Sequence, residues 1–272
     1  MKTAVGGVSD NPLRKYSECI NSLPVGIGAP SWVWPGGYAK NVEKLKSVFK
    51  EVQILVLEPP DRSPIDKAEI EALRRFESEN FSYSVHLPVP GKVAAKDDAG
   101  VRAIVEIIET FEPITVDNYV LHMERDGKEF DPELAVKRLG EIIERSGVEP
   151  ERICVENLHE DFGKTWEAVK RAGVSICFDA GHILFAGGDP FSFIDKYREK
   201  IRMAHIHGVD GADHKPLTSL PGEFTIKFLE RLQEIAMPGA VIIENYTIKE
   251  MRDSLQYLCG LYGCDTSPDA LS

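Results

Sequence analysis

Residues Arg202 to His214 read RMAHIHGVDGADH, a short apolar run that ends in two histidines and continues into a glycine-punctuated loop. Side chains two positions apart on a β-strand point to the same face, so His205 and His207 are expected to project together. Neutral imidazole is the commonest metal ligand among side chains, and the loop adds Asp213 and His214. The stretch therefore predicts a buried strand that carries a metal site at its end.

Seven other runs along the chain have the same character of a short buried strand. The eight runs span residues 25–31, 52–58, 82–88, 119–123, 153–158, 175–181, 202–208 and 240–246. Apolar residues at helical spacing lie between them, most clearly over 101–108, 228–236 and 251–259. Continuous apolar strands belong to sheets covered on both faces, and eight strand–helix units predict the α/β class with a single (β/α)8 TIM barrel. An open doubly wound sheet is the alternative, disfavoured because no glycine-rich phosphate loop follows the first strand.

Helix boundaries in the sequence agree with this alternation. Asp131 and Asp189 each precede a proline, which is typical of an N-cap followed by proline in the first helical turn. Gly147 and Gly173 lie where C-caps are expected. We expect a polar lead-in over residues 1–22 with a short helix near 13–20, one barrel domain over 23–264 and a frayed tail over 265–272.

The composition excludes several classes of protein. The chain has 272 residues, of which 43% are hydrophobic and 28% charged, as in a globular protein with a sizeable core. No run approaches the roughly 18 apolar residues of a membrane span, and no signal peptide is recognisable, so a cytoplasmic protein is expected. A net charge of −12 without a basic cluster argues against nucleic acid and anionic membranes as partners.

Five cysteines occur at no metal-finger or disulfide-framework spacing, and we expect all of them to be reduced. Cys154 and Cys177 lie inside predicted strands, where a small thiol is ordinary core filling rather than a redox group.

Imidazoles and carboxylates gather where the predicted strands end, which is where a parallel barrel builds its active site. The candidates for metal ligands are His86, His122, Glu156, Asp179, His182, His205, Asp213, His214 and Glu244. Any one of them alone is explained as well by a hydrogen bond to a neighbouring loop. Together they would repel one another unless a cation held them, and these strands and loops supply only Arg202 and Lys215 as basic side chains.

The number of candidate ligands predicts more than one ion. One metal needs three or four protein ligands and this set offers up to nine, so two or three divalent ions per chain are expected, with Glu156 as the natural bridge. Mixed imidazole and carboxylate ligands suit zinc first, with manganese or iron as alternatives. Clusters of this kind serve in-line displacement at phosphorus.

Short motifs at these strand ends resemble a known superfamily. They are VHLP at 85–88, LHM at 121–123, VENL at 155–158, FDAGH at 178–182, AHIHG at 204–208 and IIEN at 242–245. The set resembles the xylose isomerase-like barrels, which include endonuclease IV and sugar-phosphate isomerases and epimerases. HIHGVDGADH in particular looks like the branch of cobamide-remodelling phosphodiesterases called CbiR, which hydrolyse the phosphoester linkage in the nucleotide loop of corrinoids.

The resemblance implies a distribution of ligands over three ions. One would be held by His86, His122 and Glu156; the second by Glu156, Asp179, His205 and Glu244; the third by His182, Asp213 and His214. It leaves His207 as a substrate contact and makes Glu156, Glu244 and His207 the candidate catalytic residues. Asp213 and His214 are adjacent here, whereas the endonucleases separate the acid and the imidazole by one residue, so this chain departs from the pattern at the third site.

Aromatic residues after the first strand are candidates for substrate binding. Trp32, Trp34 and Tyr38, with Phe162 and Phe185, would form a stacking surface for a planar ligand, or else plug the top of the barrel. Lys215 is a candidate for neutralising a phosphate oxygen, with solvated surface as the alternative. His159 is either a substrate contact or an ordinary loop residue.

The predicted function is a metal-dependent phosphodiesterase acting on a cobamide. The alternative is a metal-dependent isomerase or epimerase of a sugar or sugar phosphate, with a single ion on Glu156, Asp179, His205 and Glu244. The expected partner is in either case a small molecule, a corrinoid or a phosphorylated sugar. An abasic-site endonuclease is disfavoured by the acidic charge, and a non-catalytic corrinoid or sugar binder is a further alternative.

Overall fold

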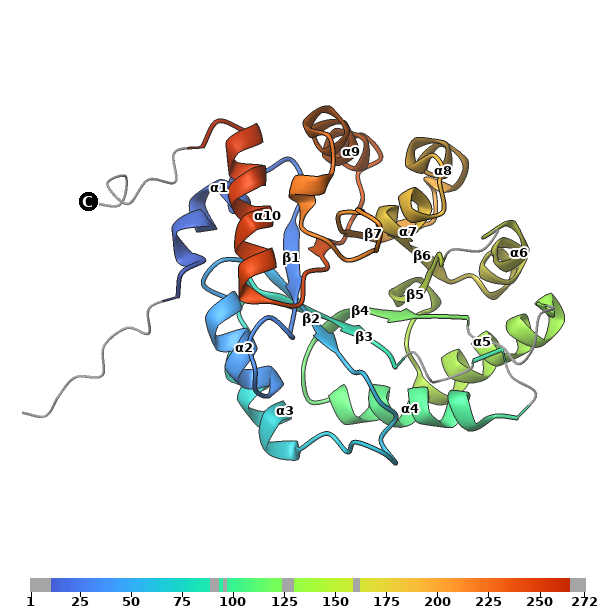
Figure 1. The fold of residues 1–272 in the computed structure, drawn as a ribbon. Coiled ribbons are helices and arrows are strands. Elements are labelled where there is room, and N and C mark those ends of the chain that lie inside the picture. The colour runs from blue at the N-terminus through green and yellow to red at the C-terminus, as the bar shows by residue number, and fades with distance from the viewer. Residues whose placement is uncertain (1–10, 89–92, 95–96, 124–129, 159–161, 265–272) are drawn as a thin grey trace, which may run out of the picture.

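Eight parallel strands close into a barrel in sequence order, and the helices surround it (Figure 1). This closed parallel barrel confirms the predicted (β/α)8 fold. The computed structural model describes residues 11–88, 93–94, 97–123, 130–158 and 162–264. The strands are β1 (Ile27–Pro30), β2 (Glu51–Leu55), β3 (Ser82–His86), β4 (Val116–Leu121), β5 (Ile153–Glu156), β6 (Ser175–Asp179), β7 (Ile201–Ile206) and β8 (Val241–Ile243).

The outer helices begin and end at the residues that the capping signals predict. Asp131 accepts hydrogen bonds from the backbone of Glu133 and Leu134, and Gly147 closes the same helix with a φ of 67°. The α-helices are α1 (Ser17–Ser22), α2 (Tyr38–Leu45), α3 (Lys67–Arg74), α4 (Ala99–Phe111), α5 (Pro132–Ser146), α6 (Phe162–Ala172), α7 (Ala180–Phe185), α8 (Pro190–Tyr197), α9 (Gly222–Glu234) and α10 (Ile248–Leu261). Three 3-10 turns accompany them, η1 (Arg14–Tyr16), η2 (Pro150–Arg152) and η3 (Leu217–Ser219).

The described part of the lead-in packs on the barrel instead of trailing from it. The side chains of Leu13, Tyr16 and Ile20 are buried in the same core as the barrel helices. In Figure 1, α1 lies beside α10, so the two ends of the described chain meet on one side. Among the described helices, none is long and apolar enough to cross a bilayer. The division of the chain at residues 22 and 264 stays a prediction.

One expectation about the cysteines is wrong. Cys19 in α1 and Cys264 after α10 form a disulfide, with their Cα atoms 5.9 Å apart across 245 residues of sequence. The two cysteines are close because the first helix packs on the last, and their spacing along the sequence does not predict this contact. Cys154, Cys177 and Cys259 are free and buried, as expected for the first two.

The disulfide predicts a countable number of thiols. Protein denatured without reductant is expected to react with a thiol reagent at three cysteines, and Cys264→Ser is expected to lower the free energy of unfolding by roughly 2–4 kcal/mol, because the bond closes a very long loop. Thiol titration and urea denaturation measure the two effects. Five reactive thiols in the unreduced protein would contradict the bond.

The barrel interior is layered between its two ends. Its middle is an apolar cluster separate from the outer core and formed by strand residues, namely Val120, Cys154, Cys177, Met203, Ala240 and Ile242. Below this layer, at the N-terminal end of β2, Glu51 is buried and accepts a hydrogen bond from Ser84 Oγ at 2.8 Å. Burial raises the pKa of Glu51 to about 7. The charge of nearby Asp117 adds to this rise, and the hydrogen bond from Ser84 opposes it.

Glu51 predicts a pH dependence of stability with a definite sign. The pKa of Glu51 in the folded state lies above its ordinary value. Its favourable contribution to the free energy of unfolding is therefore fully present below pH 4.5 and is lost as the pH rises to about 7. Glu51→Gln is therefore expected to flatten this loss and to be more stable than the wild type above pH 7, by an amount on the order of 1–3 kcal/mol. Urea denaturation of both proteins from pH 5 to 8 measures it. A wild-type minus variant difference that does not change with pH would contradict the assignment.

Candidate metal centre

Glu156, the last residue of β5, lies at the centre of the polar residues at the C-terminal end of the barrel. One carboxylate oxygen, Oε2, is 3.1 Å from Nε2 of His86 and 3.1 Å from Nε2 of His122. The other, Oε1, is 3.5 Å from Nδ1 of His205. Glu156 and His205 are buried, so these contacts are shielded from solvent. Three histidines, at or next to the ends of three different strands, thus converge on one carboxylate.

The orientation of His86 places either a proton or a metal ion between it and Glu156. Its Nδ1 is 2.9 Å from the carbonyl of Leu87, and because a carbonyl only accepts, Nδ1 must donate there. A neutral His86 then presents the lone pair of Nε2 to the Glu156 oxygen 3.1 Å away. Two facing lone pairs at that distance need a proton or a metal ion between them. The donor set therefore fits a metal.

A second group shares Glu156 and adds two more carboxylates. Glu244 Oε1 lies 3.4 Å and Asp179 Oδ2 lies 4.0 Å from Nδ1 of His205. One ligand atom from each of Glu156, Asp179, His205 and Glu244 lies within 4.8 Å of the others, and the same is true of His86, His122 and Glu156. Cys177 also approaches Glu156 and His205, and burial raises the pKa of its thiol to about 12.

Charge in this group is balanced only by imidazoles. Burial alone would raise the pKa of Glu156, yet neighbouring His205 and His122 hold it well below its usual range. Burial would likewise lower the pKa of His205, and the surrounding acidic groups raise it well above its usual value. Within the described ranges, no lysine or arginine forms an ion pair with Glu156, Asp179 or Glu244. A divalent cation would take the place of these protons.

Two buried atoms at the centre have no hydrogen-bonding partner among the described protein atoms, Asp179 Oδ2 and His205 Nδ1. The opposite ring nitrogen of His205 lies 3.0 Å from Gln53 Nε2, while Gln53 Oε1 has no partner. Rotating the Gln53 amide by half a turn would let Oε1 accept from His205 Nε2 and leave the lone pair of Nδ1 facing the carboxylates. Such a bond to the outer nitrogen is what fixes a metal-ligating histidine.

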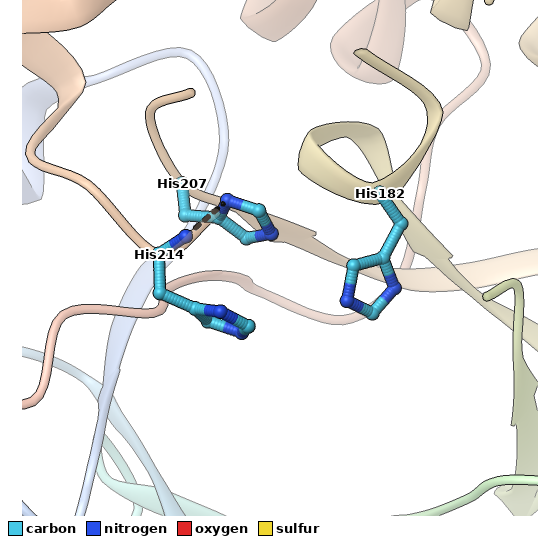
Figure 2. Close-up of side chains that lie close together, drawn as sticks. All are labelled: His182, His207 and His214. Atoms are coloured by element: carbon cyan, nitrogen blue, oxygen red, sulfur yellow. Dashed lines mark hydrogen bonds between the residues drawn. The ribbon is translucent and has the colours of Figure 1, made fainter. Parts of the chain in front are cut away.

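A third group consists of three imidazoles, His182, His207 and His214, which face one another in Figure 2. The ring centroids of His207 and His214 are 4.3 Å apart and stacked, and the ring of His182 is 5.5 Å from His207 and 5.9 Å from His214. His182 comes from α7, directly after β6, whereas the other two flank the loop after β7.

The loop between His207 and His214 is closed at its base. Gly208 and Lys215 pair through both backbone hydrogen bonds, at 2.6 and 3.0 Å. Nδ1 of His207 lies 3.0 Å from the backbone nitrogen of His214 and 3.1 Å from the carbonyl of Gly208, and the tautomer of the ring decides which of the two it bonds. His214 itself has a φ of 53°. A left-handed backbone at a residue other than glycine is strained and is typical of functional sites. Asp213 lies beside this group, with Oδ1 3.2 Å from His214 Nδ1.

His214 bridges the third group to the second. Its Nε2 is 3.4 Å from Glu244 Oε2. Burial would lower the pKa of His214, but Glu244 and Asp213 together raise it to about 9. All of the predicted ligands that the structure describes therefore lie at one end of the barrel.

A cavity of about 370 Å³ opens above these groups. Its lining includes Trp32, Leu57 and Tyr246 next to His86 and Glu156. Trp32 and Leu57 are 46% and 44% exposed, and Phe185 nearby in sequence to His182 is 45% exposed. The mouth of the site is therefore an apolar rim around a charged floor.

Several predicted substrate contacts lie elsewhere. Trp34 packs against the core with Lys44 Nζ 4.8 Å above its ring, and Tyr38 begins α2. Neither residue lines the cavity, and the side chain of Lys215 does not line it either. Phe162 is wrongly predicted as a stacking surface, because it is buried against the rings of Phe193 and Tyr197. His159 lies outside the described residues.

The structure adds residues that the sequence analysis missed. Gln53, on β2, has no signal beyond its position in an otherwise apolar strand. The side-chain amide of Asn157 donates to the backbone carbonyl of Asp179 at 2.8 Å and accepts from its backbone N–H at 2.9 Å, which ties the ends of β5 and β6 together. Tyr246 lines the cavity with its ring 5.4 Å from that of His214. Leu57 and Tyr246 each follow a strand end, which is the signal that could have found them.

Comparison with known proteins places this geometry in a family. The model of the xylose isomerase-like TIM barrel family matches residues 42–261. Endonuclease IV from Thermus thermophilus has a similar structure, with a TM-score of 0.70, 20% identity and coverage of 88% of this chain and 99% of that chain. D-psicose 3-epimerase from Clostridium cellulolyticum, solved with D-tagatose, has a TM-score of 0.63 at 16% identity over 88% and 98% of the two chains.

A third similar structure is the IolI protein, solved with a bound zinc atom, at a TM-score of 0.63, 14% identity and coverage of 87% and 96%. At these identities the likeness establishes the shared fold. No curated protein matches the sequence. The solved neighbours thus include enzymes of two reaction classes and one zinc protein.

Proposed function

The chain belongs to the xylose isomerase-like TIM barrel family, and from this premise we propose that it is a metal-dependent phosphodiesterase that cleaves the phosphoester linkage in the nucleotide loop of cobamides. One observation carries the proposal. The groups His86–His122–Glu156 and Glu156–Asp179–His205–Glu244 share a single carboxylate, which suits two adjacent ions better than one. The cobamide itself comes from the motif resemblance around His205 to His214.

Each proposed ion has an identifiable set of protein ligands. His86, His122 and Glu156 would hold the first, and Asp179, His205 and Glu244 with Glu156 the second; zinc suits these donors, with manganese or iron as alternatives. When bound, paired ions lower the pKa of an attacking water and stabilise charge on the phosphoryl oxygens. Overall, a water oxygen forms a bond to phosphorus, the bond to the leaving alkoxide breaks, and the alkoxide takes a proton.

The protein residues of the cavity have separate roles in this reaction. Glu156 holds its two oxygens toward different imidazoles, so it fixes the spacing of the two groups. Gln53 orients His205 from beneath. Tyr246 faces the same cavity, and burial followed by the charge of Glu244 raises the pKa of its phenol. Tyr246 therefore keeps its proton at any ordinary pH and is suited to donate a hydrogen bond to a phosphate oxygen.

The apolar rim supports a substrate larger than a sugar. Exposed Trp32 and Leu57 at the mouth offer a face for a flat macrocycle or base, whereas the floor offers charge for the phosphodiester. The cavity of about 370 Å³ is small for a whole cobamide, so the phosphodiester and its immediate substituents would enter while the corrin stays on the rim.

Trp32 predicts a selective effect on binding. Trp32→Ala is expected to raise KM for a cobamide about tenfold and to change kcat little, because about 1.4 kcal/mol of stacking and apolar contact is lost. Trp34→Phe is the matched control, since Trp34 does not line the cavity. Steady-state kinetics of the two variants measure the difference. A larger rise in KM for Trp34→Phe than for Trp32→Ala would contradict the proposed rim.

The direct test of the function uses metal-loaded protein and adenosylated cobamides. The expected result is a product cleaved at the nucleotide loop, identified by mass spectrometry, and its disappearance after chelation. Intact substrate with zinc, manganese and iron preparations would reject the proposal.

An isomerase or epimerase of a sugar or sugar phosphate is the second candidate. The four-residue group of Glu156, Asp179, His205 and Glu244 is sufficient for one ion that polarises a carbonyl, and the psicose epimerase among the structural neighbours favours it. Metal content separates the two candidates. A single ion per chain, unaffected by His86→Asn and His122→Asn, would favour the isomerase.

A further inference from the structure

We propose that a third ion is held by His182, His207 and His214, with Asp213 outside its ligand set. The inference rests on the proposed metal dependence but departs from the resemblance, which implies His182, Asp213 and His214 and leaves His207 to the substrate. One ligand nitrogen from each of the three histidines lies within 4.8 Å of the others, and Figure 2 shows the rings turned toward a common space.

The glycine at position 181 leaves the space that the imidazole ring of His207 occupies. A Cβ atom at Gly181 would lie 2.2 to 2.4 Å from three atoms of the His207 imidazole, so only glycine fits there. His207 is fully buried, its Nε2 lies 3.5 Å from Asp179 Oδ1, and its Nδ1 lies 3.1 Å from the carbonyl of Gly208. A neutral ring that donates from Nδ1 to this carbonyl presents the lone pair of Nε2 to the Asp179 oxygen, and a cation between them would relieve that contact. A residue that merely touched substrate would not need this enclosed seat.

The orientation of His182 directs a lone pair into the same space. Its Nδ1 is 3.0 Å from the carbonyl of Asn157 and must donate to it, so a neutral ring carries its lone pair on Nε2. In Figure 2 this nitrogen is on the side of the ring that faces His207 and His214. A carbonyl bond to the outer nitrogen is the usual partner of a metal-ligating histidine.

Asp213 is placed to orient His214 instead of binding an ion. Its Oδ1 lies 3.2 Å from Nδ1 of His214, while Nε2 of the same ring points toward Glu244 at 3.4 Å. Its side chain is 34% exposed, whereas that of His207 is fully buried. A carboxylate behind the outer nitrogen of a ligating imidazole is a positioning group. The adjacency of Asp213 and His214 in sequence gives this geometry directly.

The donor set has a chemical consequence. Three imidazoles without a carboxylate suit zinc and related borderline ions, and they bind magnesium or calcium poorly. The third ion would keep most of its positive charge, because none of its three ligands is anionic. Its charge would then be available to a phosphate oxygen at the edge of the cavity lined by His182 and His214.

Zinc titration of chelator-stripped full-length protein, in competition with a chromophoric chelator, tests the assignment. The wild type is expected to bind three zinc ions per chain. His207→Asn is expected to bind one fewer, and Asp213→Asn to keep all three while one of them binds about 10- to 100-fold more weakly. Asp210→Asn, which removes an exposed carboxylate from the same loop, is the matched control and is expected to behave as the wild type.

Gly181→Ala provides a second route that retains every ligand. The added methyl would displace the His207 ring, and alanine is favourable within a helix, so the same ion is expected to bind at least about tenfold more weakly in a protein whose melting temperature shows it to be folded. Unchanged zinc binding in both His207→Asn and Gly181→Ala would overturn the proposal.

Other outcomes are equally decisive. Loss of an ion in Asp213→Asn, alone or together with His207→Asn, would make Asp213 a ligand and overturn its role as a positioning group. Two ions in the wild type would remove the third site and leave the phosphodiesterase proposal standing. A wild type that binds no zinc, manganese or iron would instead defeat the metal-dependent function itself.

Discussion

Glu156→Gln is expected to reduce phosphodiester turnover by at least about 10³-fold and to remove the first two ions together. Glutamine offers one neutral oxygen where the carboxylate places Oε2 3.1 Å from His86 and Oε1 3.5 Å from His205, so neither proposed ion keeps its shared ligand. Losing about 4 kcal/mol of metal-derived stabilisation of the transition state corresponds to that factor. Cleavage rates and metal content by mass spectrometry measure the two effects.

A matched control exists inside the same barrel. Glu51→Gln replaces another buried glutamate by its isostere, but at the N-terminal end of β2 on the far side of the apolar layer. Because Glu51 belongs to none of the groups around Glu156, the amide is expected to change neither turnover nor metal content. A Glu156→Gln protein that retains both ions and more than about a tenth of the wild-type rate would contradict the role assigned to the bridging carboxylate.

The barrel could be predicted because its signal is local and repeated. Each buried strand is a short continuous apolar run, and capping residues such as Asp131 and Gly147 mark the helices between them. The same regularity placed the ligands, since parallel strands in a barrel present their C-terminal ends on one side. His86 and Glu156 are 70 residues apart, yet their positions at strand ends predict that they meet.

What could not be predicted depends on contacts between elements. The disulfide of Cys19 with Cys264 exists because α1 packs on α10. Phe162 is an aromatic residue that could stack on a ligand, and only its packing against the rings of Phe193 and Tyr197 shows that it belongs to the core. The seat that Gly181 provides for His207 likewise requires the distance between β7 and α7. Strand-end position identifies which residues meet, but it does not determine which nitrogen faces which oxygen.

Removal of the metals is expected to lower the melting temperature by about 10–20 °C. Glu156, Asp179 and Glu244 are buried within one group, and no described lysine or arginine pairs with them, so only protonated imidazoles would balance their charge without a metal. Each ion present at about 100 times its Kd stabilises the folded state by roughly 2.7 kcal/mol, and two ions by about 5 kcal/mol. For a protein of this size each kcal/mol shifts the melting temperature by about 2–4 °C.

Calorimetry of the zinc-loaded and chelator-treated protein measures the shift, and the disulfide is left intact because the chelator does not reduce it. In Glu156→Gln the difference between the two preparations is expected to fall by the contribution of the two ions that share Glu156, leaving only that of the ion on His182, His207 and His214. Equal melting temperatures of the two wild-type preparations would mean that the carboxylates are neutralised without metal. That result would remove the physical basis for a metal centre at this end of the barrel, because the same buried charge that demands a cation must also make its loss destabilising.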